Sequence, residues 1–222
     1  MIMERGIIHL NITRFMAEAA ALQDSALHDR PFIIAHSRQA RAVVLEASEA
    51  ASREGVFRGM AVKTALRRLP GVPVIDPDPA LYTRLQQTMT HIADRYSPCV
   101  EVTGNGHLFI DITGTHRLWG APLDVAAQVK HAFQAPLHLA PSTGLSCNKI
   151  VSKVATRVAQ PRGFVSIPPG EESHFLEPQP IALLPGIGPA IHQRLRTLGI
   201  VSLGDLAALP PTLAALALGK HA

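Results

Sequence analysis

The stretch Val100–Thr113 constrains the fold more than any other part of the chain. Its letters are VEVTGNGHLFIDIT, and apolar residues alternate with polar or smaller ones on both sides of Gly104-Asn105-Gly106. This alternation is the period-two pattern of half-buried strands. The two glycines and the asparagine between the runs tolerate the positive φ angles of a tight turn. The stretch therefore predicts a β-hairpin whose buried side carries Val100, Val102, Leu108, Ile110 and Ile112.

Length and composition set broad limits. With 222 residues and 47% hydrophobic side chains, the chain can bury a core and hold one to three small domains. A net charge of +4 and a pI near 9.4 are compatible with a polyanionic partner. Cys99 and Cys147 have no metal-type spacing, which suits a reducing compartment. No apolar leader or membrane span is evident, so we expect a cytoplasmic protein with no membrane partner.

Periodicity predicts further elements on either side of the hairpin. A strand is expected at Gly6–Ile12, with Thr13 as the N-cap of the helix that follows. Asp76-Pro77-Asp78-Pro79 is expected to cap a long helix with one apolar face, formed by Leu81, Leu85, Met89, Ile92 and Tyr96. Shorter strands are predicted at Pro31–Ala35, Ala42–Leu45 and Leu137–Ala140, and shorter helices at Ser48–Arg53, Met60–Leu69 and Asp124–Phe133.

The segment Ile181–Leu209 has the pattern of a helix–hairpin–helix. Pro185-Gly186-Ile187-Gly188 separates two apolar stretches, the second of which turns Ile191, Leu195 and Leu198 inward and stops at Gly199. Glycines in such a turn let backbone N–H groups approach a DNA phosphate. The DNA-binding candidates are therefore Pro185, Gly186, Ile187 and Gly188, with Lys149, Arg194 and Arg196 as electrostatic support.

The hairpin and the first strand resemble the Y-family (translesion) DNA polymerases. Glu101, Phe109, Asp111 and Thr113 keep the family's frame Glu-x-x-Ser-x-Asp-Glu followed by aromatic-Leu-Asp-x-Thr, and His9, Phe15 and Ala17 keep the frame of the first strand and helix. The resemblance places Asn11, Gly106 and His107 where the family has metal-binding carboxylates. It places Met16 where the family has the aromatic residue that rejects ribonucleotides.

Two other segments carry the resemblance, and with the helix–hairpin–helix, which matches the family's thumb, it runs from His9 to about Leu209. The first retains Ser48, Ala51, Gly55, Val56, Gly59 and Met60, and the second retains Gly144, Asn148, Lys149, Lys153 and Ala155. Glu49 and Ser52 stand where the family grips the incoming triphosphate with tyrosine and arginine. Lys153 matches a lysine that contacts the triphosphate in active relatives. The nucleotide-binding positions implied by the resemblance are thus Met16, Glu49, Ser52 and Lys153.

The resemblance implies an α+β fold shaped as a polymerase right hand. A ferredoxin-like palm would comprise residues 1–22 and 80–168, small fingers 23–79, and a helical thumb with the helix–hairpin–helix 169–222. The family's further DNA-gripping domain, the little finger, is expected to be absent from this chain.

Phosphoryl transfer by two Mg²⁺ ions requires oxygen ligands, chiefly carboxylates. Because Asn11, Gly106 and His107 cannot supply that charge, we predict a chain that is not an enzyme, has no catalytic or metal-binding residue and uses no cofactor. It most resembles the ImuB-type proteins of DNA damage-induced mutagenesis in bacteria. These act as adaptors with a recombinase-like partner, a replicative-type polymerase and a sliding clamp. The expected partners are therefore DNA, as duplex or primer–template, and such mutasome proteins.

Two alternatives remain open at this stage. The chain could be an active translesion polymerase with unusual ligands, in which case Mg²⁺ would be its cofactor. It could also be a simple DNA-binding module that uses only the hairpin at residues 185–188. Primer extension separates the first alternative from the adaptor, and capture of partner proteins separates the second.

Overall fold

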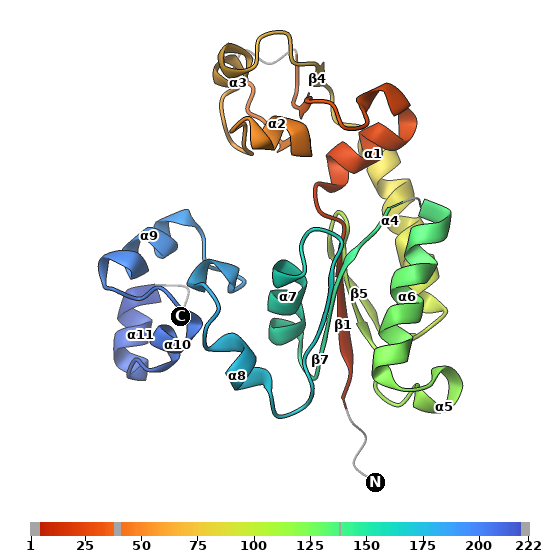
Figure 1. Ribbon diagram of the computed structural model, residues 1–222, viewed down its shortest axis with the longest axis vertical. Coiled ribbons are helices and arrows are strands. Elements are labelled where there is room, and N and C mark those ends of the chain that lie inside the picture. Colours follow the sequence, from red (N-terminus) through yellow and green to blue (C-terminus); the bar gives the residue numbers. More distant parts are fainter. Residues whose placement is uncertain (1–4, 38–40, 138, 219–222) are drawn as a thin grey trace.

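The computed structural model describes residues 5–37, 41–137 and 139–218, and its central element is a five-stranded sheet (Figure 1). The strand order is β5-β6-β1-β7-β8. These strands span Ile7–Asn11 (β1), Val100–Gly104 (β5), His107–Asp111 (β6), Ser142–Ser146 (β7) and Phe164–Ser166 (β8). β1 pairs antiparallel with β6 and β7, whereas β7 and β8 are parallel. Because β1 lies in the middle and both faces are covered, all five of its residues are buried.

The predicted hairpin is confirmed, but only one of its strands is buried. Gly104 pairs with His107 around Asn105-Gly106, and Gly106 has a φ of 75°. Leu108 on β6 is fully buried, whereas Val102 on β5 is 45% exposed. The prediction that Val102 faces the core is therefore wrong, because β5 is the edge strand of the sheet.

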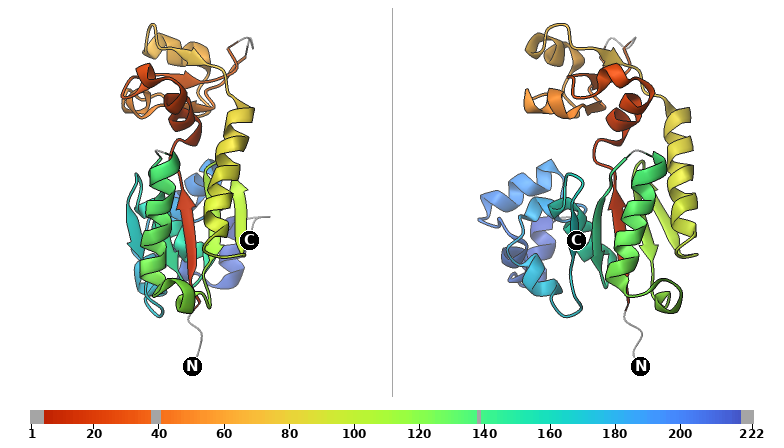
Figure 2. Two further views of the ribbon diagram at one scale, coloured as in Figure 1. Left: turned by 90° about the vertical axis from the view of Figure 1, so that its right-hand side faces the viewer. Right: turned by 45° about the vertical axis from the view of Figure 1, so that its right-hand side comes forward.

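Helices cover both faces of this sheet. α4 (Pro79–Asp94) and α6 (Pro122–Leu137) lie on one face and α7 (Lys149–Val158) on the other, with the short α5 (His116–Trp119) before α6 (Figures 1 and 2). The predicted cap of α4 is confirmed, since Asp78 Oδ1 accepts the N–H of Leu81 at 2.9 Å. The apolar face of α4 is confirmed as well. It packs into the largest hydrophobic cluster through Leu81, Met89 and Ile92, with Leu85 and Tyr96 partly buried.

The strand after α6 lies further along the chain than predicted. α6 continues to Leu137, and the strand is β7 at Ser142–Ser146, whose letters are STGLS. Its polar composition hides it from a search for apolar alternation, yet all five residues are buried. They are buried because β7 lies between β1 and β8 and beneath α7.

Residues 24–78 contain a smaller body built on a three-stranded sheet of order β3-β2-β4. Its elements are η1 (Ser25–Leu27), β2 (Ile33–Ile34), β3 (Glu46–Ala47), α2 (Glu49–Arg53), α3 (Val62–Arg68) and β4 (Val74–Ile75). The strand predicted at Ala42–Leu45 is displaced to β3, and only Val43 of that range forms a bridge, with Ala61. β4, which pairs parallel with β2, was not predicted. Ile33 and Met60 belong to a separate hydrophobic cluster in this body.

α1 (Phe15–Gln23) connects β1 to the smaller body. Its N-cap is Arg14, with a left-handed φ of 55° and no side-chain capping bond. The prediction of Thr13 as the cap is therefore wrong. Arg14 therefore occupies the N-cap position between β1 and α1, and no side-chain hydroxyl caps the helix.

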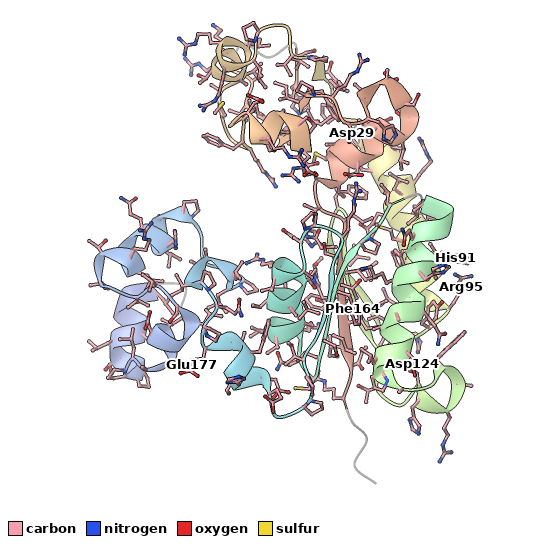
Figure 3. All side chains as sticks on the ribbon, viewed as in Figure 1. Asp29, His91, Arg95, Asp124, Phe164 and Glu177 are labelled. Carbon is pink, nitrogen blue, oxygen red and sulfur yellow. The ribbon has the colours of Figure 1, made fainter. Side chains whose placement is uncertain are left out.

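The C-terminal residues form a third group, which is helical. It comprises α8 (Glu172–Leu176), η2 (Ile181–Leu183), α9 (Pro189–Thr197), α10 (Leu203–Ala207) and α11 (Pro211–Leu218). Glu177 is the C-cap of α8, and its carbonyl accepts the N–H of Gly204 at 3.0 Å, which ties α8 to α10 (Figure 3). The helix–hairpin–helix is recovered with two corrections. Its first helix is only a single 3₁₀ turn, and Leu198 is 61% exposed while Leu195 is buried.

α4 and α6, at 16 residues each, are the longest helices among the described residues. None of the helices in that part of the chain is both long and apolar enough to cross a membrane.

Candidate functional site

A polar pocket opens where β1 ends beside the hairpin turn. Asn11, the last residue of β1, is the register partner of His107, the first residue of β6. The pocket has a volume of about 490 Å³ and lies among β1, the hairpin, α7 and the smaller body. Its polar lining includes His9, Asn11, Thr13, Arg14, Glu46, Arg58, Asn105, His107, Lys153, Arg157 and Gln160.

The structure brings some of the predicted positions together and separates others. Asn11, His107, Met16 and Lys153 all line the pocket. Glu49 lines a different cavity, beside α1 and η1, and its carboxylate pairs with Arg53 at 2.6 Å. Ser52, on the same short helix α2, does not line the pocket either. The two positions on α2 therefore do not line this pocket, and their role in nucleotide binding stays a prediction.

Gly106 belongs to the turn and not to the pocket wall. Its N–H donates to Gln86 Oε1 at 2.8 Å, which ties the turn to α4. A Cβ added to Gly106 would lie 2.8 Å from the Phe15 ring, and its φ of 75° disfavours other residues. This position therefore has no room for a carboxylate side chain unless the hairpin and α1 shift.

Two neutral histidines form the floor of the pocket. His9 is 1% exposed, its Nδ1 lies 2.9 Å from Thr156 Oγ1, and its ring centroid lies 5.6 Å from that of His107. Burial, with smaller contributions from His107, Lys153 and Arg157, lowers the pKa of His9 to about 3. Burial followed by the charges of Lys153 and Arg157 lowers the pKa of His107 to about 4. Nε2 of His9 and Nδ1 of His107 are buried without a hydrogen-bond partner.

Four cations surround this floor, and a single carboxylate opposes them. Arg14, Arg58, Lys153 and Arg157 line the pocket together with Glu46. Burial raises the pKa of Glu46, whose Oε2 accepts the N–H of Ala17 at 2.9 Å. Desolvation lowers the pKa of both Lys153 and Arg157. The pocket therefore has a strongly positive potential.

Sequence reasoning identified Lys153 but missed the three arginines. The spacing of Lys153 and Arg157, four residues apart on α7, was an available signal that both lie on one helical face. Arg14 and Arg58 had no comparable signal, and Arg58 reaches the pocket only because the smaller body packs against α1.

Acid is expected to destabilise the fold through these histidines. The folded state binds protons on His9 only near pH 3, whereas the unfolded chain binds them near pH 6.5. Stability present above pH 6.5 is therefore lost as the pH falls towards 3, by about 3 kcal/mol for His9 alone at pH 4.5. Urea unfolding between pH 7 and 4.5 measures this loss.

His107→Gln should make that loss smaller, because it removes one of the two histidines. His116→Gln, which changes an exposed histidine on α5, is the matched control and should leave the loss unchanged. Equal pH dependence in both variants would contradict the burial of neutral His107.

The residues of the pocket do not fit a Mg²⁺ ion. Mg²⁺ requires oxygen ligands, chiefly carboxylates, and Glu46 is the only carboxylate that lines the pocket. Within the described ranges, no three His, Cys, Asp or Glu side chains are placed to hold a metal ion together. The donor set is therefore suited to an anion.

A second candidate site is the hairpin between η2 and α9. Gly186 is exposed with a φ of 93°, and nothing lies within 4 Å of where its Cβ would be. Gly188 is the N-cap of α9, and no side chain caps the helix. The N–H groups of Ala190 and Ile191 in the first turn of α9 therefore have no side-chain cap and could face an anion. DNA binding by Pro185–Gly188 stays a prediction.

The cations predicted to support that hairpin are less well placed. Lys149 Nζ pairs with Glu101 at the edge of the sheet. Arg194 and Arg196 are exposed in the last turn of α9, at the end of the helix opposite Gly188. A role for these three side chains in DNA binding stays a prediction.

Comparison with known proteins identifies the family. Residues 10–157, about two thirds of the chain, match the model of the impB/mucB/samB family. The chain therefore belongs to this family, and the predicted Y-family membership is confirmed. A DNA polymerase IV from Dehalococcoides mccartyi (strain CBDB1) is 32% identical over 218 residues, which are 98% of this chain and 56% of the relative. A DNA polymerase IV from Caulobacter vibrioides is 34% identical over 216 residues, or 97% of this chain and 53% of the relative.

Solved structures confirm the predicted right-hand fold with palm, fingers and thumb. DinB from Sulfolobus solfataricus superposes with a TM-score of 0.88 at 22% identity, over 97% of this chain and 63% of that one. An insertion ternary complex of Dbh DNA polymerase gives 0.85 at 21% identity, over 97% and 64%. The chain thus spans a little over half the length of the curated relatives that it matches.

Two predictions are contradicted by these comparisons. The chain was expected not to be an enzyme, yet relatives that match it along 98% of its length are named DNA polymerase IV. It was expected to use no cofactor, yet polymerases of this family normally need Mg²⁺. The sequence inference failed because it equated missing carboxylates with missing activity. The relatives are named DNA polymerases, whereas the pocket of this chain is lined by a single carboxylate.

Proposed function

We propose that this chain is the DNA-binding core of a Y-family polymerase that acts in translesion synthesis. Membership of the impB/mucB/samB family supports the proposal, as do relatives named DNA polymerase IV. The main structural support is the hairpin at Pro185–Gly188, where Gly186 is exposed and no side chain caps the first turn of α9, so that backbone N–H groups there can approach a phosphate. The palm at 1–22 and 80–168, the fingers at 23–79 and the thumb at 169–222 are the domain boundaries we propose.

The chain's place in an assembly is a further part of this proposal. The resemblance to ImuB-type proteins suggests a recombinase-like protein, a replicative-type polymerase and a sliding clamp as partners. Pull-down of each purified candidate, with and without damaged DNA, tests this part. A cytoplasmic location stays a prediction of the sequence.

Binding of primer–template DNA through the thumb tests the proposal. We expect the affinity of a non-specific contact, with a dissociation constant of about 10⁻⁴–10⁻⁶ M at physiological salt. Gly186→Val should weaken binding at least fivefold, because a side chain would stand between the backbone and the phosphate. Fluorescence anisotropy with a labelled primer–template measures the change.

Gly199→Val is the matched control for backbone strain. Gly199 also has a left-handed φ, of 78°, with nothing within 4 Å of its Cβ, but it lies at the other end of α9. Both variants should lose similar stability, and only Gly186→Val should lose DNA affinity. Equal losses of affinity would remove the hairpin from the DNA-binding surface.

Template-directed nucleotide addition is a second candidate function, favoured by the name DNA polymerase IV that the relatives bear. In this chain Lys153 would orient a triphosphate, and Met16 would line the sugar side of the same pocket. Replacing Asn11 and His107 with acidic residues should change nucleotide addition more than any other substitution in the pocket.

A further inference from the structure

A polar contact ties the smaller body, at residues 24–78, to α1. Glu46 lies on β3 of that body, and its Oε2 accepts the N–H of Ala17, in the first turn of α1, at 2.9 Å. We propose that Glu46 is a positioning residue whose carboxylate locks the angle between the smaller body and the five-stranded sheet. This role does not depend on which ligand the pocket binds or on DNA binding by Pro185–Gly188.

The N-terminus of α1 has no cap from its own N-cap residue. Arg14 has a left-handed φ and forms no side-chain capping bond. The first N–H groups of a helix lack partners within the helix, and they attract negative charge. Glu46 supplies that charge from 29 residues along the chain, so α1 is capped only while the smaller body is in place. Four other helices, α2, α4, α7 and α10, are capped by their own N-cap side chains, which are Ser48, Asp78, Asn148 and Ser202.

α1 packs against both parts of the chain. Phe15 and Ala19 belong to the largest hydrophobic cluster, whereas Ala17 packs with Phe32 and Ile34 of the smaller body. In the part of the chain that the structure describes, the second cluster buries only these last three residues. Because apolar contact has no preferred direction, so small a cluster constrains the angle weakly. A charge-assisted hydrogen bond is directional and constrains it more strongly.

The arrangement of the two parts makes this angle important. Figures 1 and 2 show the smaller body beyond the end of β1, joined to the five-stranded sheet at α1 and at the start of α4. Arg58 and Glu46 of the smaller body line the pocket at the end of β1, together with Arg14 and Met16 of α1 and Lys153 of α7. If the smaller body turned away, Arg58 and Glu46 would leave the lining and the pocket would open. Glu46 therefore positions Arg58 as well as α1.

The surroundings of Glu46 favour a role in position over one in overall stability. Burial raises the pKa of its carboxyl group, whereas the N–H groups of Ala17 and Met16, followed by the charges of Arg58 and Arg14, lower it. Neither arginine forms an ion pair with Glu46 among the described residues, so the amides of α1 are its direct partners. A partly buried carboxylate is costly to desolvate, and a neutral side chain would avoid that cost. The charge is therefore better explained by the directed contact with α1.

Pulsed EPR distance measurement tests the lock. Spin labels on Cys99, which is exposed beside the five-stranded sheet, and on Lys63→Cys, on the exposed side of α3, report the angle in a chain that also carries Cys147→Ser. The distance distribution should be narrow in this parent chain. Glu46→Ala should broaden it about twofold, because other orientations become populated. Amide exchange followed by NMR should show the N–H of Ala17 exchanging about tenfold faster, because the cap is lost.

Glu54→Ala is the matched control. Glu54 is an exposed carboxylate of the same body, at the C-cap of α2, so its removal changes the net charge equally without touching α1. It should change neither the distance distribution nor the exchange of Ala17. Glu46→Gln keeps the size of the side chain and one acceptor oxygen, and it should broaden the distribution less than Glu46→Ala does. It replaces the alanine variant as the test if Glu46→Ala fails to unfold cooperatively in urea.

Three results would overturn the proposal. Unchanged distances in the folded Glu46 variants, whatever the exchange rate of Ala17, would limit Glu46 to a local effect on α1. Equal broadening in Glu46→Ala and Glu54→Ala would assign the effect to net charge. Broader distances without faster exchange at Ala17 would show that the capping bond is not what holds the smaller body.

Discussion

Gly144→Ala is expected to destabilise the protein by about 3 kcal/mol or more, which places it among the most damaging single changes in the chain. Gly144 lies in the middle of β7, paired with His9 on β1 and Val165 on β8. An added Cβ would lie 2.1 Å from the carbonyl oxygen of Ser152 and 2.7 Å from the amide nitrogen of Thr156. Both are backbone atoms of α7, so the helix itself must move away from the sheet.

Urea unfolding measures this change, and Gly188→Ala is its control. Gly188 has no atom within 4 Å of a new Cβ and no positive φ, so alanine there should cost at most about 1 kcal/mol as a weaker helix cap. Equal stability of the two variants would contradict the close packing of α7 on β7.

Asn11→Asp combined with His107→Glu is expected to make nucleotide binding depend on Mg²⁺. The two new carboxylates would face each other across the β1–β6 register, and a divalent cation relieves their mutual repulsion. Nucleotide affinity in EDTA should fall at least tenfold, because carboxylates would repel the phosphates and pair with Lys153 and Arg157. Adding Mg²⁺ should then strengthen binding to the double variant.

The same double variant tests the second candidate function. Single-nucleotide incorporation into a primer–template with Mg²⁺ should rise at least tenfold over the unmodified chain, because carboxylates provide the ligands that the pocket lacks. Gly106 is left unchanged, since a side chain there would collide with Phe15. Asn11→Ala with His107→Ala is the control, because it removes both side chains and adds no charge. A control that gained the same activity would show that side-chain removal, and not metal binding, was responsible.

If Mg²⁺ weakens nucleotide binding to the double variant, the new carboxylates are neutralised by Lys153 and Arg157. The pocket would then remain an anion site even with acids restored. Adding Lys153→Gln to the double variant would distinguish this result from a failure of the carboxylates to converge, since it frees them for a metal ion.

Local sequence determined the elements whose signals lie within a few residues of one another. Asn105-Gly106 forces a two-residue turn because glycine accepts a φ of 75°, and the hairpin follows from the apolar residues beside it. Asp78 and Pro79 start α4 because the aspartate satisfies the amide of Leu81. The family frame then placed these elements in a right hand, which the solved structures confirm.

Only the tertiary structure decided which apolar residues are buried and which strand is central. Val102 is exposed because β5 lies at the edge, and the polar β7 is buried because it lies between β1 and β8. The alternation of apolar and polar residues within one strand indicates neither result. Strand order is set by pairings between distant segments, so a local pattern cannot report it.

The site shows the same division. The sequence alone indicated that Asn11 and His107 stand where the family has acids, and that Lys153 would lie nearby. The structure placed Arg14, Arg58 and Arg157 in the lining of the pocket and Glu49 at a different cavity. It also placed His9 against Thr156, 147 residues away. Charge in a pocket depends on side chains that converge from separate elements. Packing brings them together, and for that reason the positive potential of this site was visible only in the folded chain.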